Sequence, residues 1–220
     1  MTALAQVLSS GASTLVLACS VAACLDELAA LPLCDLTRGR LQCVGQACGG
    51  GALQQIDPRG VLLAEWDVAW DDPGVAALVD GREHVVALDP PYRHGHVALV
   101  ERAIDTGAQV HLYYGDDQRH TTAKLLRYLV HPRFAMVCMY RALRQGTMGG
   151  DVRRMAAELA WREGRVALRP EALALAGEVL AGLDLDQTPG GEAKMDLDSV
   201  PAYAQAAADY EECSRLCRIL

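Results

Sequence analysis

The stretch His84-Val-Val-Ala-Leu-Asp-Pro-Pro-Tyr-Arg-His-Gly-His96 joins an apolar, β-rich run to a Pro-rich turn and then to a helical pattern. Similar apolar runs recur through residues 1–130, separated by stretches with apolar residues at three- and four-residue spacing. This alternation is typical of a parallel sheet with crossover helices. The predicted strands are Thr14–Cys19, Leu41–Val44, Val61–Trp66, His84–Leu88 and Val110–Tyr114.

Four helices are predicted between or after these strands, at Val21–Leu31, Val75–Asp80, Gly95–Ile104 and Thr121–Val130. The predicted strands are almost wholly apolar, so helices should cover both faces of the sheet. We therefore expect residues 1–130 to form a Rossmann-like α/β domain with a mostly parallel sheet.

The strand signal ends after residue 131, and a helical pattern replaces it. Helices are predicted around Phe134 and Val137, at Asp151–Trp161 and at Pro170–Ala181, where Pro170 suits a first helical turn. We expect residues 131–188 to form a small Arg-rich helical unit, with a winged helix as one possible arrangement. A linker and a C-terminal docking helix, which begins near Ser199, should occupy residues 189–220.

Composition indicates a folded protein, because 51% of the residues are hydrophobic. The apolar run that begins at Thr14 is too short for a membrane span, and no charged segment precedes it. We therefore expect a cytoplasmic protein without membrane contact. The 8 cysteines include no Cys-x-x-Cys pair, which favours reduced, mostly buried thiols over a metal site.

Charge is distributed in blocks, although the formal net charge is −8. Residues 131–170 carry 8 basic and 3 acidic side chains, and every basic one is an arginine, the side chain that holds phosphate bidentately. A tryptophan in the same block could stack on a base. The candidate nucleic-acid-binding residues are Arg141, Arg144, Arg153, Arg154, Trp161, Arg162, Arg165 and Arg169. Pairing of these arginines with the acidic regions on either side is an equally open interpretation.

No catalytic set is evident in the sequence, since it contains no P-loop and no Gly-x-Ser-x-Gly elbow. A candidate for small-molecule chemistry is the turn from Asp89 to His96, where His94 and His96 flank Gly95. Two imidazoles near a carboxylate could serve a nucleotide-binding or other α/β enzyme. A rigid strand-to-helix turn explains the same residues, and we expect no metal ligands here.

Several segments in order resemble the C-terminal region of RecJ-type single-strand-specific DNA exonucleases. They are His84-Val-Val-Ala-Leu-Asp-Pro-Pro91, Val110-His-Leu-Tyr-Tyr-Gly-Asp116, Pro132-Arg-Phe-Ala-Met-Val-Cys-Met-Tyr-Arg-Ala-Leu143, the stretch from Leu173 to Leu183, and Gly191-Glu-Ala-Lys-Met-Asp-Leu-Asp-Ser-Val-Pro-Ala-Tyr203. The first 80 residues match that region only in their general α/β character.

The resemblance implies a non-catalytic accessory region that helps a nuclease engage DNA or partner proteins in recombination and repair. The Asp-His-His motif of the family's phosphoesterase core is missing, so no catalytic residue carries over, and divalent metal is expected only in that core. The implied partners are the RecJ catalytic core, single-stranded DNA and the single-strand-binding protein. A purely structural docking module is the remaining alternative.

Overall fold

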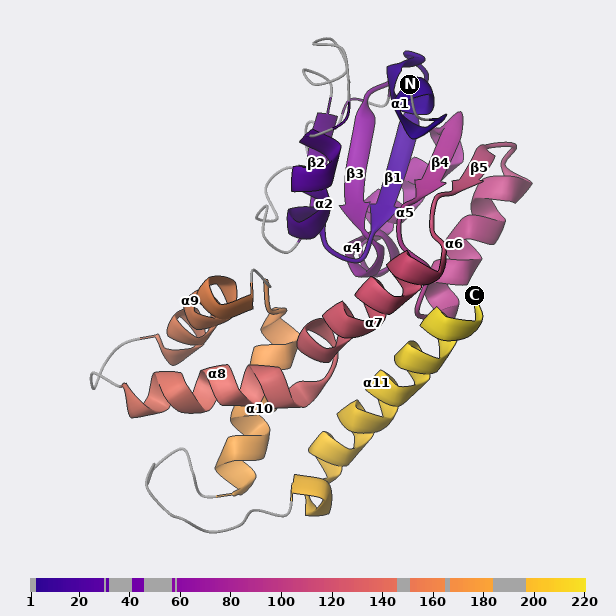
Figure 1. The fold of residues 1–220 in the computed structure, drawn as a ribbon. Helices are drawn as coiled ribbons and strands as arrows, with labels where there is room; N and C mark the ends of the chain where they lie inside the picture. The colour runs from indigo at the N-terminus through magenta and orange to yellow at the C-terminus, as the bar shows by residue number, and fades with distance from the viewer. Residues whose placement is uncertain are drawn as a thin grey trace. The chain divides into compact units, whose positions relative to one another are not determined.

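The structure, a computed structural model, describes residues 3–29, 31, 41–45, 57, 59–145, 151–164, 167–183 and 197–220 (Figure 1). The chain divides into two compact units. Unit 1 comprises Met1–Thr122 and Leu216–Leu220, and unit 2 comprises Ala123–Arg215. Helices α7 (Asp116–Leu129) and α11 (Pro201–Ile219) each contribute residues to both units.

Unit 1 is built on a five-stranded sheet in which every strand pair is parallel, with the order β2-β3-β1-β4-β5. The strands are β1 (Thr14–Ala18), β2 (Leu41–Val44), β3 (Val61–Glu65), β4 (His84–Ala87) and β5 (Gln109–Leu112). All residues of the central strand β1 and of its neighbour β3 are buried. The predicted α/β class with a parallel sheet is thus confirmed.

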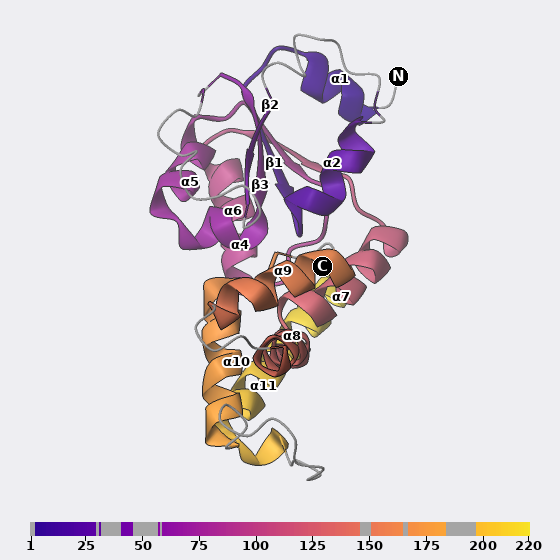
Figure 2. The same cartoon turned by 90° about the vertical axis from the view of Figure 1, so that its left-hand side faces the viewer.

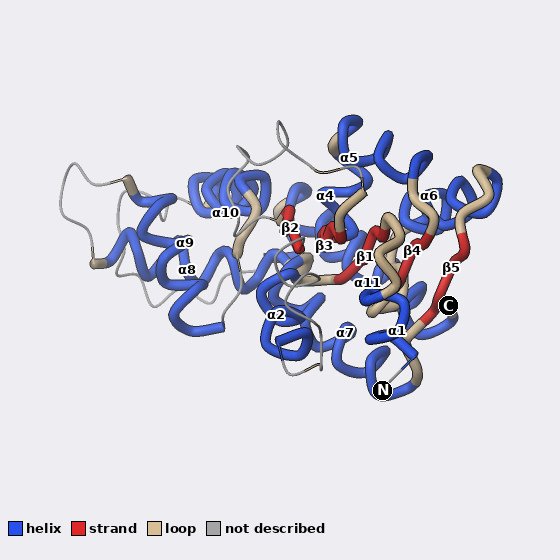
Figure 3. The backbone as a smooth tube through the Cα atoms, turned by 90° about the horizontal axis from the view of Figure 1, so that it is seen from above, coloured by secondary structure: helices blue, strands red, loops and turns tan. Residues whose placement is uncertain are grey.

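Helices cover both faces of this sheet, as Figures 2 and 3 show. Helices α1 (Ala3–Ser9) and α2 (Val21–Ala29) lie on one face. Helices α4 (Trp66–Asp71), α5 (Pro73–Ala77) and α6 (His94–Asp105) lie on the other, together with the 3-10 turn η3 (Leu78–Gly81). Burial on both faces explains why the strands read as continuous apolar runs rather than as alternating patterns.

Several predicted boundaries in unit 1 differ from the structure: for example, the helix predicted from Thr121 begins at Asp116, and two further differences concern the start of a helix. Strand β3 ends at Glu65, and Trp66 opens the unpredicted helix α4 instead of closing the strand. The helix predicted at Val75–Asp80 begins two residues earlier, as α5, because Asp72 caps it by accepting bonds from the amides of Gly74 and Val75. It continues as η3.

Unit 2 packs helices around an aliphatic core. Its elements, besides the parts of α7 and α11, are α8 (Pro132–Arg144), α9 (Val152–Gly164), α10 (Pro170–Gly182) and the 3-10 turn η4 (Leu197–Ser199). The core contains Ala135, Cys138, Met139 and Ala142 of α8, Ala156, Leu159 and Ala160 of α9, and Leu173, Ala176, Val179 and Leu180 of α10. The described part of unit 2 contains no strand, so it shows no wing of a winged helix.

The predicted C-terminal helix is present as α11, and it buries one apolar stripe. Tyr203, Tyr210, Cys213 and Cys217 all lie among the buried residues. The last turn is anchored within unit 1, where the Arg119 guanidinium donates to the carbonyl oxygen of Leu220 at 2.7 Å. Of the helices in the described ranges, none has the length and apolarity needed to cross a membrane.

Candidate functional site

Helix α8 carries its functional side chains on its outer face. Its inner face enters the core of unit 2, so the residues at the remaining helical positions point outward. Arg133, Val137, Arg141 and Arg144 are all exposed, and their spacing of four, four and three residues aligns them along one side. The start of the helix is stabilised by His131, whose Nδ1 atom accepts a hydrogen bond from the Arg133 amide at 3.1 Å, and by Pro132 in the first turn.

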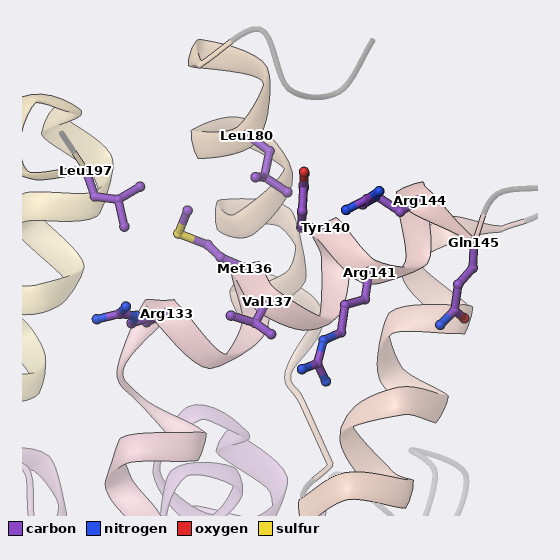
Figure 4. Close-up of a pocket in the computed structure, with 9 residues that line it drawn as sticks. All are labelled: Arg133, Met136, Val137, Tyr140, Arg141, Arg144, Gln145, Leu180 and Leu197. Atoms are coloured by element: carbon purple, nitrogen blue, oxygen red, sulfur yellow. The ribbon is translucent and has the colours of Figure 1, made fainter. Parts of the chain in front are cut away.

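A cavity of about 380 Å³ opens beside α8 (Figure 4). Apolar side chains from three elements form most of its lining, and Met136 of α8 points toward Leu197 of η4. The complete lining is Arg133, Met136, Val137, Tyr140, Arg141, Arg144, Gln145, Leu180 and Leu197. The guanidinium of Arg144 lies 6.0 Å from the centroid of the Tyr140 ring, within the range of a cation–π contact.

A second cavity, of about 420 Å³, is richer in aromatic rings. Its lining is Arg127, Tyr128, His131, Arg133, Phe134, Val137 and Tyr210. Tyr128 packs edge-to-face on Phe134 with ring centroids 5.0 Å apart, and His131 meets Tyr210 at 4.8 Å. The Tyr128 side chain nevertheless remains 42% exposed and is therefore available to a ligand.

The two cavities adjoin, because Arg133 and Val137 line both of them. We call their combined lining the α8 groove. It contains four arginines, Arg127, Arg133, Arg141 and Arg144, and no carboxylate among its described lining residues. Burial lowers the pKa of the groove residue His131, as do the positive charges of Arg133 and Arg127, whereas the negative charge of Glu211 raises it.

The structure separates the candidate residues of the basic block. Of the candidate residues that the structure describes, Arg141 and Arg144 line the α8 groove. Arg154, Trp161 and Arg162 line a shallower hollow on α9, where the Arg154 Nε atom lies 3.1 Å from Glu158 Oε1. Arg153 is exposed on α9, and Arg169 is the N-cap residue of α10. Arg165 lies outside the described residues.

Sequence reasoning missed much of the α8 groove. Arg127 precedes the basic block, and Arg133 belongs to the block but is not among the candidate residues. The aromatic members Tyr128, Phe134, Tyr140 and Tyr210 come from three different helices. The spacing of Arg133, Arg141 and Arg144 on one helix face was the signal that could have identified the basic side of the groove.

Unit 1 has its own candidate position, at the carboxyl ends of β1 and β4. These strands are neighbours, and their following connections lead to opposite edges of the sheet, which is where open α/β sheets bind ligands. At this position Asp89 is already engaged in hydrogen bonds within the protein. Its Oδ2 accepts from the Cys19 amide at 2.7 Å, its Oδ1 accepts from the Thr122 hydroxyl at 3.1 Å, and its carbonyl accepts from the Trp66 indole at 3.3 Å.

The histidines of the Asp89 to His96 turn point to different surroundings. His94 is exposed, whereas the ring of His96 is fully buried and stacks on Trp66 at 5.3 Å between centroids. The His96 Nε2 atom lies 3.1 Å from Asp67 Oδ1, and its Nδ1 accepts from the Tyr92 amide at 3.4 Å. Both ring nitrogens are therefore engaged inside the protein, and this geometry favours a rigid turn over a catalytic one.

The nearby Cys19 thiol is also unsuited to chemistry. Burial raises its pKa well above the usual value, and the charges of Asp89, Asp67 and Glu65 raise it further. The thiol stays protonated, and a protonated thiol is a poor nucleophile. Among the residues that the structure describes, no group of three or more His, Cys, Asp and Glu side chains is placed to hold a metal ion.

The two positions thus differ in what they offer to a ligand. Side chains at the carboxyl ends of the strands are bonded to one another, whereas the α8 groove combines exposed arginines with the exposed ring of Tyr128. The chain matches no protein-family model, no curated protein and no solved structure.

Proposed function

We propose that this chain is a non-catalytic accessory region of a RecJ-like single-strand DNA exonuclease, and that unit 2 holds single-stranded DNA in the α8 groove. The observation that carries this proposal is the composition of the groove. It combines Arg127, Arg133, Arg141 and Arg144 with the rings of Tyr128, Phe134, Tyr140 and Tyr210, and its described lining contains no carboxylate.

Single-stranded nucleic acid is the ligand that matches both kinds of side chain. Guanidiniums follow the phosphate backbone, while unpaired bases stack on aromatic rings irrespective of sequence. Bases in a duplex are already stacked on one another, so the exposed ring of Tyr128 offers them little. We therefore expect the groove to prefer single strands over duplex DNA.

The proposed function assigns the chemistry to a different part of the nuclease. The RecJ catalytic core would hold the divalent metals and cleave the phosphodiester bond, and this chain would help that core to engage its substrate in recombination and repair. The hydrogen bonds of Asp89 to the Cys19 amide and of His96 to Asp67 support an accessory role, since these side chains are already engaged within the protein. A cytoplasmic location accompanies this proposal.

A second candidate ligand is an acidic peptide segment with an apolar side chain, presented by a partner such as the single-strand-binding protein. The apolar floor of Met136, Val137, Leu180 and Leu197 favours it, because a hydrophobic side chain buried there would leave water. The surrounding arginines would hold the carboxylates of the peptide. A chain that binds neither ligand would be a purely structural docking module.

Stacking in the groove is tested with the variant Tyr128→Ala. Base stacking on an aromatic side chain contributes about 1–3 kcal/mol, so we expect the affinity for a fluorescent oligo-dT strand to fall about 5- to 100-fold. Tyr128→Phe should retain most of the affinity because the ring remains. Fluorescence anisotropy with the full chain measures these changes, and circular dichroism verifies that each variant folds.

Trp161→Ala is the matched control for that experiment. Trp161 is 41% exposed, close to the 42% of Tyr128, and it also lies in unit 2, but it lines the hollow on α9 instead of the groove. We expect this variant to bind oligo-dT as well as the unchanged chain does. A loss with Trp161→Ala and none with Tyr128→Ala would move the DNA site to α9 and refute the proposed groove.

A further inference from the structure

Two histidines lie side by side on one face of the sheet in unit 1, next to its outer strand β5. His84 opens β4, and His111 lies in β5, the last strand in the sheet order. In the parallel register Val86 is the partner of His111, and Val86 shares a sheet face with His84 because strand side chains alternate. His84 and His111 are therefore diagonal neighbours on the same face.

Their geometry is well defined. The His84 Nδ1 atom lies 3.0 Å from His111 Nε2, and the ring centroids are 5.1 Å apart. Both residues are half-buried, so their rings are supported by neighbours and still reach solvent. The His111 ring also stacks on Tyr113, with centroids 6.2 Å apart and an angle of 27° between the planes, which restricts its rotation.

We propose that His84 Nδ1 and His111 Nε2 form a two-histidine site for a divalent transition-metal ion. Imidazole nitrogens bind such ions at about 2.0–2.1 Å, so two of them at a right angle around one ion lie about 3 Å apart. The observed separation of 3.0 Å matches this arrangement. Both donors are carried by hydrogen-bonded strands, so little ordering is needed when the ion binds.

The neighbouring groups define the kind of ion. The adjacent Glu83 carboxylate accepts from the Ser13 amide at 2.8 Å and from its hydroxyl at 3.2 Å, so it is already engaged. Imidazole ligands suit copper, nickel and zinc, and Cu²⁺ should bind most tightly of the three. Water would fill the other coordination positions. Neither histidine is among the described residues that line the α8 groove.

Nickel titration of the untagged full chain tests the site. Isothermal titration calorimetry should show one Ni²⁺ per chain, and His84→Ala and His111→Asn should each weaken binding at least tenfold because one ligand cannot chelate. His120→Ala is the matched control, since His120 is exposed on α7, outside the pair, and this variant should bind Ni²⁺ as the unchanged chain does.

A simple hydrogen bond between the two rings would explain the same 3.0 Å separation without a metal. The electron paramagnetic resonance spectrum of the chain with one equivalent of Cu²⁺ separates these two explanations. Coupling to two imidazole nitrogens that disappears in His84→Ala supports the site. A Ni²⁺ titration that is flat, or that is identical for the unchanged chain and His84→Ala, would overturn it.

Discussion

Charge reversal at two positions of the α8 groove, Arg133→Glu together with Arg144→Glu, is expected to weaken binding of single-stranded DNA about 100-fold. Each change removes a phosphate contact and adds a repulsive carboxylate, and a loss of about 1.4 kcal/mol for each corresponds to a tenfold weaker affinity. The net charge of the chain is −8, so attraction of DNA must come from such local groups. Fluorescence anisotropy with oligo-dT at a fixed, low salt concentration measures the change.

The charge-matched control is Arg153→Glu together with Arg162→Glu. These residues belong to the same basic block and the same unit, and both are exposed on α9, but neither lines the α8 groove. Their reversal changes the net charge of the chain equally, so it should reduce affinity only a few-fold through the long-range field. Equal losses for the two double variants would mean that the binding depends on overall charge and not on the groove.

Replacement of Trp66 by alanine is expected to lower the free energy of unfolding of unit 1 by about 3–5 kcal/mol. The Trp66 side chain is 0% exposed, stacks on His96 and donates its indole hydrogen to the carbonyl of Asp89. Its removal leaves a cavity at the carboxyl ends of the strands and takes a donor from the partly buried Asp89 carbonyl. Urea denaturation monitored by circular dichroism measures the change.

Trp70 provides the internal comparison, because it lies on the same helix α4 and is 46% exposed. Trp70→Ala should cost no more than about 1 kcal/mol, since much of its surface is already in water. Trp66→Phe should fall between the two alanine variants, because the ring is retained and the hydrogen bond is lost. Equal destabilisation by Trp66→Ala and Trp70→Ala would contradict a structural role for the Asp89 to His96 turn.

The strands were predictable because each one is a short apolar run with a sharp end. The range Leu41–Val44 agrees with β2 at both boundaries, and His84–Leu88 extends one residue beyond β4. The strand order was not predictable, because it depends on pairings between residues far apart in the chain. Trp66 was assigned to a strand for a related reason, since its apolar character indicates burial but does not distinguish a strand end from a helix start.

The candidate sites were even harder to predict, because they too combine residues that are far apart in the chain. The basic block was visible as a local excess of arginine, but helix geometry then divides Arg144 and Arg162 between separate surfaces. The groove also includes Tyr210 of the last helix, which is far along the chain from the basic block. The pair of His84 and His111 combines residues 27 positions apart on neighbouring strands, a distance at which no local spacing rule applies.

The salt dependence of single-strand binding tests the central proposal most directly. Each phosphate contact on a single strand contributes about −0.7 to the slope of log Kobs against log salt concentration. With four arginines in the groove, the unchanged chain should show a slope of about −2.8 on oligo-dT, and Arg133→Glu with Arg144→Glu should reduce it to about −1.4. Absence of binding at low salt, or the same slope for both proteins, would contradict the proposal that the α8 groove holds single-stranded DNA.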